Sequence, residues 1–275
     1  MTPAANLLII FSTAAAWAQT AQFEVASIKP SPPPGPGRML SGSRGGPGTN
    51  DPGLFTCERC SLSSLIFRAF DIQSYQLAAP DWMQTTRFNI SAKIPDGATK
   101  DQFRLMMRSL LTERFKLQFH FEKKEVQEYD LVVAKSGLKM KESSAELDPD
   151  ERPGRLTERK LDPEGFVLLP PGRVPMMMIY EGHATERHTG EPMEQLATGL
   201  ASQLSHPVTD ATGLKGKYDF TLRWVAEDAV PSAGADPGPN IFRALQEQLG
   251  LKLESKKGMV DILVVDHIEK TPTEN

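Results

Sequence analysis

Residues 103–133 read FRLMMRSLLTERFKLQFHFEKKEVQEYDLVV, and residues 242–265 read FRALQEQLGLKLESKKGMVDILVV. Both stretches begin with Phe-Arg on a helical pattern of apolar residues, continue with alternating apolar and polar residues, and end in Leu-Val-Val. Two earlier blocks also recur in the same order: Leu62-x-x-Leu65-x3-Ala69 with Met193-x-x-Leu196-x3-Leu200, and Arg87-Phe88-Asn89-Ile90 with Lys217-Tyr218-Asp219-Phe220. Repeated blocks in a fixed order indicate repeated structural units. The sequence therefore predicts two copies of one α/β unit.

Each predicted copy consists of a helix, a strand, a second helix and a hairpin. In the first copy, Thr99 and Gln102 form a capping box before the second helix, and polar residues 122–125 are expected to turn the hairpin. In the second copy, Asn240 begins and Gly250 ends the equivalent helix, and residues 255–258 are expected to turn the hairpin. Helices packed against an antiparallel sheet give an internally duplicated α+β fold, not a doubly wound parallel sheet.

Composition divides the chain into five segments. We predict a signal peptide over 1–18, an N-terminal strand with a Pro/Gly-rich loop over 19–53, the first repeat over 54–140, a linker with short strands over 141–180, and the second repeat over 181–275. The loop within the second segment, residues 31–53, contains almost no apolar residues. Loops of that length are usually functional or disordered, and both interpretations stay open.

An export signal is predicted at the start of the chain. Residues 7–16 form a short apolar run that ends in Ala16-Trp17-Ala18, a pattern typical of a cleaved secretory signal. The run is too short to span a bilayer, which needs about 20 apolar residues. No Lys or Arg precedes it, which departs from the usual pattern and leaves an N-terminal helix or an uncleaved anchor as the alternative. We expect cleavage after Ala18 and a secreted or periplasmic protein without a stable membrane span.

The net charge of −4 offers no basic face for nucleic acid. No cofactor is predicted, because Gly45-Gly46-x-Gly48 lies in a Pro/Gly loop without the strand and helix of a phosphate-binding motif.

Several blocks resemble a known family. They are Ala79-Pro80-Asp81-Trp82, Leu110-Leu111-Thr112-Glu113-Arg114-Phe115-Lys116-Leu117, Leu131-Val132-Val133-Ala134-Lys135-x-Gly137, and Asp210-x-Thr212-Gly213-Leu214-x-Gly216-x-Tyr218-Asp219-Phe220. They are similar to those of a soil-associated secreted family of unknown function, whose domain also occurs fused to membrane sensor peptidases of the antibiotic-responsive type. The resemblance covers nearly the whole mature chain. It implies a domain outside the cytoplasm whose partner is an unknown envelope protein or a small ligand, and it supplies no activity, cofactor or catalytic residue.

Cys57-Glu58-Arg59-Cys60 directly precedes a predicted helix. A helix N-terminus favours a thiolate, which is the physical basis of redox C-x-x-C sites. Two cysteines in an exported chain more often form a structural disulfide, and we predict one between Cys57 and Cys60. Free thiols and a redox or metal role are the alternatives. The pair is not part of the family pattern.

Residues 181–188 contain metal-ligand types without a suitable spacing. Glu181, His183, Glu186 and His188 lie close in sequence, but the two histidines do not share one helical face and no His-Glu-x-x-His is present. We therefore predict a solvated loop or strand end and no metal site. Met176-Met177-Met178 could bind copper(I) with those histidines, but a methionine run in an apolar strand is more often part of a core.

No catalytic motif stands out, since there is no Gly-x-Ser-x-Gly elbow. Asp210 and Thr212 begin a turn ahead of the strand that contains Tyr218, and Trp82 occupies the corresponding place in the first copy. These aromatic-flanked turns could frame a binding surface, with packing at a junction as the simpler interpretation. We predict a sensor-type binding module without catalysis. The alternative is a hydrolase acting on extracellular polymers or cell-envelope components.

The export signal gives the first testable prediction. N-terminal sequencing of the protein recovered from the periplasm or medium should begin at Gln19, because Ala16-Trp17-Ala18 provides the small residues that the peptidase requires. Variant Ala18→Arg should block processing, while Ala14→Leu, inside the apolar run, should leave it intact. A wild-type product that still starts at Met1 would contradict the prediction.

Overall fold

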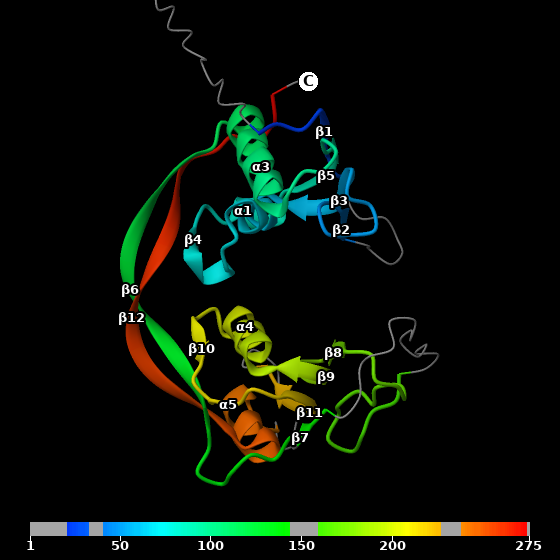
Figure 1. Ribbon diagram of the computed structural model, residues 1–275, viewed down its shortest axis with the longest axis vertical. Coiled ribbons are helices and arrows are strands. Elements are labelled where there is room, and N and C mark those ends of the chain that lie inside the picture. Colours follow the sequence, from blue (N-terminus) through cyan, green and yellow to red (C-terminus); the bar gives the residue numbers. More distant parts are fainter. Residues whose placement is uncertain (1–20, 33–40, 144–158, 227–237, 274–275) are drawn as a thin grey trace, which may run out of the picture. The chain divides into compact units, whose positions relative to one another are not determined.

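The computed structural model describes residues 21–32, 41–143, 159–226 and 238–273. The predicted signal peptide and its cleavage site after Ala18 lie outside these residues. The fold is α+β, with five α-helices and three four-stranded sheets in the described part of the chain (Figure 1). The chain forms two compact units. Unit 1 contains residues 79–120 and the segments up to 72 and from 264 onward, and unit 2 contains residues 73–78 and 121–263.

Unit 1 contains an antiparallel sheet with strand order β1-β5-β3-β2. Its elements are β1 (Val25–Pro30), β2 (Gly42–Gly45), β3 (Leu54–Ser61), α1 (Leu62–Phe70), α2 (Trp82–Thr85), β5 (Arg87–Lys93) and α3 (Lys100–Phe115). The capping box of Thr99 and Gln102 at the start of α3 is confirmed. Helix α3 packs on the sheet through edge-to-face contacts of Phe103 with Phe55 and of Phe115 with Phe88.

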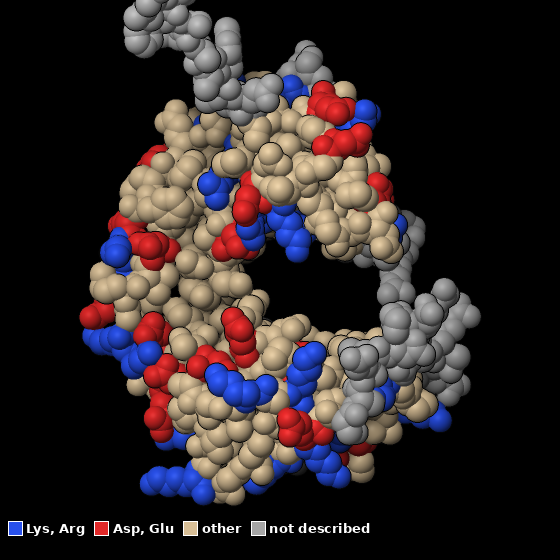
Figure 2. Space-filling view, in the orientation of Figure 1, with Lys and Arg blue, Asp and Glu red and all other residues tan. Residues whose placement is uncertain are grey.

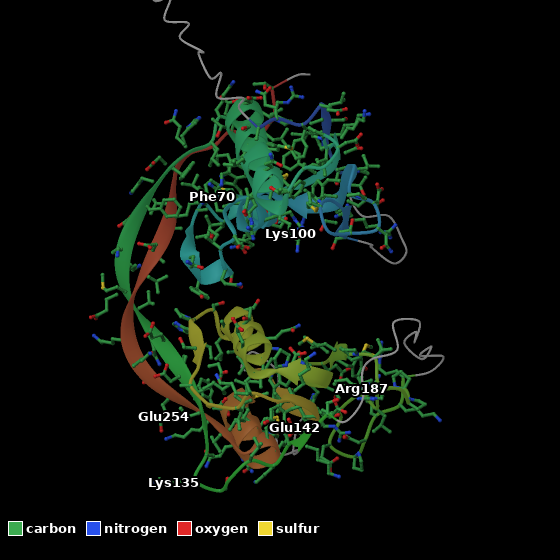
Figure 3. All side chains as sticks on the ribbon, in the orientation of Figure 1. Phe70, Lys100, Lys135, Glu142, Arg187 and Glu254 are labelled. Carbon is green, nitrogen blue, oxygen red and sulfur yellow. A yellow bond between two sulfur atoms is a disulfide. The ribbon has the colours of Figure 1, made fainter. Side chains whose placement is uncertain are left out.

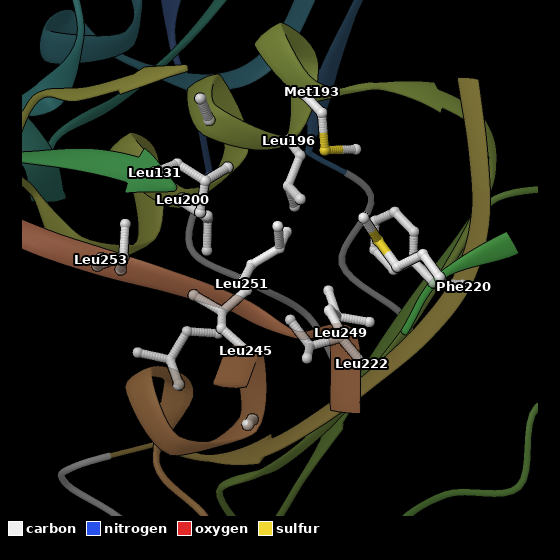
Figure 4. Packing of buried hydrophobic residues seen from close by; sticks show 14 of the residues in the cluster. Leu131, Met193, Leu196, Leu200, Phe220, Leu222, Leu245, Leu249, Leu251 and Leu253 are labelled. Carbon is white, nitrogen blue, oxygen red and sulfur yellow. The ribbon is translucent and has the colours of Figure 1, made fainter. Parts of the chain in front are cut away.

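Unit 2 contains a second antiparallel sheet, with strand order β7-β11-β9-β8. Its elements are η1 (Ser74–Gln76), β4 (Leu77–Ala78), β7 (Lys141–Glu142), β8 (Met176–Tyr180), β9 (His183–Pro192), α4 (Met193–Leu204), β10 (Val208–Asp210), β11 (Lys217–Val225), α5 (Ile241–Ala244) and the π-helical turn η2 (Leu245–Leu249). Asn240 caps α5 and Gly250 ends η2, as the sequence predicts. The apolar faces of α4, β11 and η2 meet in one core, which includes Leu196, Leu222 and Leu249 (Figure 4).

The two predicted hairpins are wrong. Residues 118–133 and 251–267 each form one continuous strand, β6 (Gln118–Val133) and β12 (Leu251–His267), which are neighbours in the sheet β10-β6-β12-β4. Lys257 forms an ion pair with Glu125 at 2.7 Å, and Lys256 contacts both Glu128 and Asp130. A tight hairpin turn needs residues that readily adopt positive φ, and the charged residues 122–125 are not of that type. In the second expected turn, Gly258 does not adopt a positive φ. Gly258 instead makes room for the Glu128 carboxylate.

Each unit has a β-bulge just before its first long helix. In unit 1, Cys57 pairs with Ile90 and Cys60 with Phe88, so β3 has one extra residue. Arg59 at the bulge has φ 54° and donates its backbone N–H to Asn89 Oδ1 at 2.9 Å. The bulge therefore has its backbone donor satisfied by a side chain of the neighbouring strand.

The bulge of unit 2 has the same construction. His188 pairs with Phe220 and Glu191 with Tyr218. Gly190 has φ 62° and donates its N–H to Asp219 Oδ1 at 2.7 Å. Desolvation raises the pKa of Asp219, but hydrogen bonds from Gly190 and Ser143 and the charge of Arg173 outweigh it and hold the pKa below its usual range.

Two expectations about local burial need correction. The Met176–Met178 segment is a strand, β8, but it lies at a sheet edge, where Met177 and Ile179 are exposed. The residues of this apolar run are exposed or half-buried, so the run does not belong to the core. The loop predicted over 31–53 contains a strand as well, β2 (Gly42–Gly45), which pairs with β3. Residues 33–40 of that loop lie outside the described residues.

The side-chain hydrogen bond at the unit 2 bulge gives a stability prediction. Asp219→Ala should lower the free energy of unfolding by about 1–3 kcal/mol, because the Gly190 N–H loses its acceptor. Asp219→Asn keeps an oxygen in the same place, as Asn89 does in unit 1, and should lose clearly less. Urea unfolding followed by circular dichroism measures both. Equal losses for the two variants would show that the hydrogen bond to Gly190 is not what matters.

Candidate functional site

Cys57 and Cys60 form a disulfide, with Cα atoms 5.9 Å apart. Both cysteines are buried, at 3% and 9% exposure. The bridge spans the bulge of β3 and ends two residues before α1 begins. It therefore fixes the junction between strand and helix in unit 1.

Trp82 is the first residue of the short helix α2 in unit 1. Its ring is partly exposed, and Lys270 Nζ lies 5.2 Å from the ring centroid. Such a position is typical of a cation–π contact. Trp82 is therefore engaged with the C-terminal segment of its own unit.

Asp210, Thr212 and Tyr218 belong to unit 2. Asp210 Oδ1 accepts hydrogen bonds from the Thr212 N–H at 2.9 Å and from its hydroxyl at 2.7 Å, and Thr212 Oγ1 accepts from the Leu214 N–H. These bonds form the predicted turn after β10. Tyr218 is only 6% exposed and lies within the hydrophobic core. Its ring contributes to packing and is not open to a ligand. A binding surface at these residues would therefore be formed by the turn of Asp210 and Thr212.

His188 lies in strand β9, not in a solvated loop. Its Nε2 is 2.9 Å from Glu186 Oε1 and its Nδ1 is 3.5 Å from Glu191 Oε2. The Glu186 contact has the distance of an ion pair without the alignment of a hydrogen bond. The imidazole also stacks on Phe220, with ring centroids 4.6 Å apart. Desolvation lowers the pKa of His188, but Glu186 and Glu191 outweigh it and raise the pKa above its ordinary value.

Neither a metal cluster nor a membrane span is found in the described ranges. They contain no group of three or more His, Cys, Asp or Glu side chains arranged to hold a metal ion. Among the same residues, every helix is too short or too polar to cross a bilayer.

Three basic side chains gather at one pocket of unit 1. Arg68 comes from α1, and Lys100 and Arg104 come from the first turns of α3. Residues 45–49, which follow β2, supply another part of the wall. The pocket has a volume of about 390 Å³, within the range of small-molecule sites. Lys100 is labelled in Figure 3, close to α1.

The basic side chains differ in how far they are neutralised. Arg104 pairs with Asp71 at 2.6 Å and with Asp101 at 2.7 Å. Within the described chain, no carboxylate lies within ion-pair distance of Arg68 or Lys100. Elsewhere, acidic and basic residues are interspersed over the visible face (Figure 2). The pocket therefore holds a local excess of positive charge in a chain that is negative overall.

Glycines let the loop approach Lys100 closely. Gly48 has φ 85°, and a Cβ there would lie 3.0 Å from Lys100 Cε. Gly45 has φ 76°, and a Cβ there would collide with the Leu54 carbonyl. Thr49 closes the turn by donating its hydroxyl to the Gly46 carbonyl at 2.8 Å. Both positions favour glycine because their φ is positive, a backbone conformation that other residues adopt only with strain.

This pocket is not recognisable from the sequence. Its parts lie in the 45–49 loop, in α1 and at the start of α3, and only the fold brings them together. The one usable signal is the stretch Gly45-Gly46-Pro47-Gly48, which the sequence marks only as part of a Pro/Gly loop. A second hollow of about 360 Å³ lies beside β1, but its lining includes Glu24 and Glu113 as well as Arg114, so it has no excess of positive charge.

A family model described as "Protein of unknown function (DUF3738)" matches residues 63–268. The chain belongs to this family. The matched span covers α1, α3 and all of unit 2, so DUF3738 describes most of both units. The glycine loop and the disulfide of this DUF3738 member lie before the matched residues.

Comparison with other proteins adds no activity. No curated protein matches the chain, and no solved structure does. The site of this DUF3738 member must therefore be interpreted from its own residues.

His188 gives a pH prediction. Its pKa is raised in the folded protein, so the imidazolium stabilises the fold at and below the ordinary histidine pKa of about 6.5. This contribution is lost as the pH rises through the folded-state pKa. The unfolding free energy of wild type should therefore exceed that of His188→Gln by more at about pH 6 than at about pH 9. His267→Gln, at the exposed end of β12, is the control. An equal gap at both pH values for His188→Gln would contradict the assignment.

Proposed function

We propose that this DUF3738 protein is a binding module that recognises a small ligand outside the cytoplasm. The pocket of unit 1 supports the proposal most directly. It is formed by three separate segments, and its basic side chains converge on a space large enough for a small molecule. Binding requires only such a preformed, chemically distinctive hollow.

The location of the protein stays a proposal. It is supported by the apolar run that ends at Ala16-Trp17-Ala18 and by the two bonded cysteines, because disulfides persist in oxidising compartments. The resemblance to a soil-associated secreted family adds the expectation that related domains are attached to sensor peptidases. Recognition of a ligand or an envelope partner fits such a place, by analogy only.

We also propose that the two units arose by internal duplication. Support comes from their matching sheet orders, β1-β5-β3-β2 and β7-β11-β9-β8, each followed along the chain by a long strand. In both bulges the backbone N–H of the bulge residue donates a hydrogen bond to a side-chain oxygen of the neighbouring strand. The acceptor is Asn89 in unit 1 and Asp219 in unit 2. The backbone N–H of Ser31 bonds to Arg87 O, and that of Ser143 bonds to Lys217 O. Shared irregularities are better support for common ancestry than shared regular elements, because packing alone does not demand them.

The alternative, a hydrolase acting on extracellular polymers or envelope components, has less support. Ser64 at the pocket donates its hydroxyl to the Ser61 carbonyl at 2.7 Å, and Asp71 pairs with Arg104. His188 is held by two carboxylates in the other unit. A nucleophile needs a base within hydrogen-bond reach, and these side chains are engaged in structural contacts.

A ligand screen tests the proposal. The mature protein should show a saturable rise in melting temperature with at least one compound of a panel containing neutral, cationic and anionic small molecules. Lys100→Trp, which places an indole at the pocket, should abolish that rise. Lys29→Trp, at an exposed site on β1, should retain it. A panel without any hit, or a hit that Lys100→Trp leaves unchanged, would refute binding at this pocket.

A further inference from the structure

We propose that the pocket of unit 1 binds the phosphate group of a phosphorylated small molecule, an inference that rests on the proposed function. Arg68 and Lys100 would bind the phosphate oxygens, and the loop 45–49 would close around the group. Three features support this assignment: the charge of the pocket, the position of Arg68, and the end of α3 that lines the pocket.

Charge favours a dianion. The pocket contains three cations and one carboxylate in its lining, and that carboxylate, Asp71, is already paired with Arg104. Arg68 and Lys100 are thus the two charges that a ligand would neutralise. A phosphate monoester carries nearly two negative charges at neutral pH, whereas a carboxylate carries one. The number of charges therefore favours the phosphate over a carboxylate.

Arg68 is held in place before any ligand arrives. Its Nη2 donates to Ser43 Oγ at 2.5 Å, and its guanidinium lies over the Phe55 ring, 5.4 Å from the centroid. The Arg68 side chain is exposed, and its partial desolvation against the pocket wall lowers its pKa. A fixed guanidinium with unused N–H groups matches the geometry of a phosphate.

The start of α3 also favours an anionic ligand. Lys100 is its first residue, and Phe103 and Arg104 of its first turns also line the pocket. The N-terminal end of a helix carries partial positive charge, which attracts phosphate groups. Phe67 and Phe103 give the pocket an apolar side, which an organic group attached to the phosphate could contact.

Isothermal titration calorimetry at fixed ionic strength tests the inference. The probes are inorganic phosphate, glucose 6-phosphate, glucose and glucuronate. Wild type should bind both phosphates saturably, glucuronate roughly tenfold or more weakly, and glucose not at all. Arg68→Gln and Lys100→Gln should each weaken phosphate binding by roughly tenfold. Lys29→Gln, which removes an exposed charge on β1, should have no effect. The Lys100 side chain is exposed, so its variant keeps the test valid if Arg68→Gln fails to fold.

The outcomes separate this inference from the proposed function. Absence of phosphate binding up to about 10 mM, or equal binding of glucuronate, would overturn the phosphate assignment. Phosphate binding that Lys29→Gln weakens as much as Lys100→Gln does would overturn the site. If the phosphates fail while another ligand of the screen still binds and is blocked by Lys100→Trp, the inference fails and the binding function stands.

Discussion

A β-bulge leaves one backbone N–H without a partner in the neighbouring strand, and a donor removed from water in this way must find another acceptor. In both units that acceptor is a side-chain oxygen, from Asn89 and from Asp219. The extra residue redirects the chain, and the helix begins three residues after Arg59 in unit 1 and three residues after Gly190 in unit 2. The direction of α1, and with it the position of Arg68 at the pocket, thus depends on this bulge, which the hydrogen bond at Arg59 and the Cys57–Cys60 disulfide both hold.

Local signals in the sequence were sufficient for helices α1, α3, α4 and α5, but not for the short helix α2 or for strands β2 and β9. The caps at Thr99 and Asn240 and the stop at Gly250 act through contacts within a few residues, so they can be recognised without the fold. The hairpins failed for the opposite reason. Alternation in residues 118–133 and 251–267 shows that they are strands, but it does not show which strand pairs with which. Pairing of β6 with β12 brings together residues far apart in sequence, through Glu125 and Lys257 among others.

The residues of the candidate site also divide into those that a local motif reveals and those that only the fold brings together. Cys57 and Cys60 were recognisable because a disulfide between near neighbours leaves its mark in one short motif. The basic pocket was not, because Arg68 and Lys100 are ordinary residues of solvated helix faces until the fold places the 45–49 loop beside them. Tyr218 is buried because alternation in β11 turns its ring into the core. Residues 183–188 contain several charged side chains and show no clear apolar pattern, so the sequence favours a solvated loop or strand end where the fold has strand β9.

The residues at equivalent positions of the two bulges differ in their chemistry. Cys57 and Cys60 in unit 1 correspond by pairing to His188 and Glu191 in unit 2, since each pair flanks the extra residue. The disulfide holds its bulge whatever the pH, whereas attraction between His188 and Glu191 requires a proton on the imidazole. The unit that contains the basic pocket is therefore the one whose strand-to-helix junction is insensitive to proton concentration. A pocket that relies on a fixed guanidinium gains from that arrangement, because a shift of α1 would move Arg68 away from the loop that faces it.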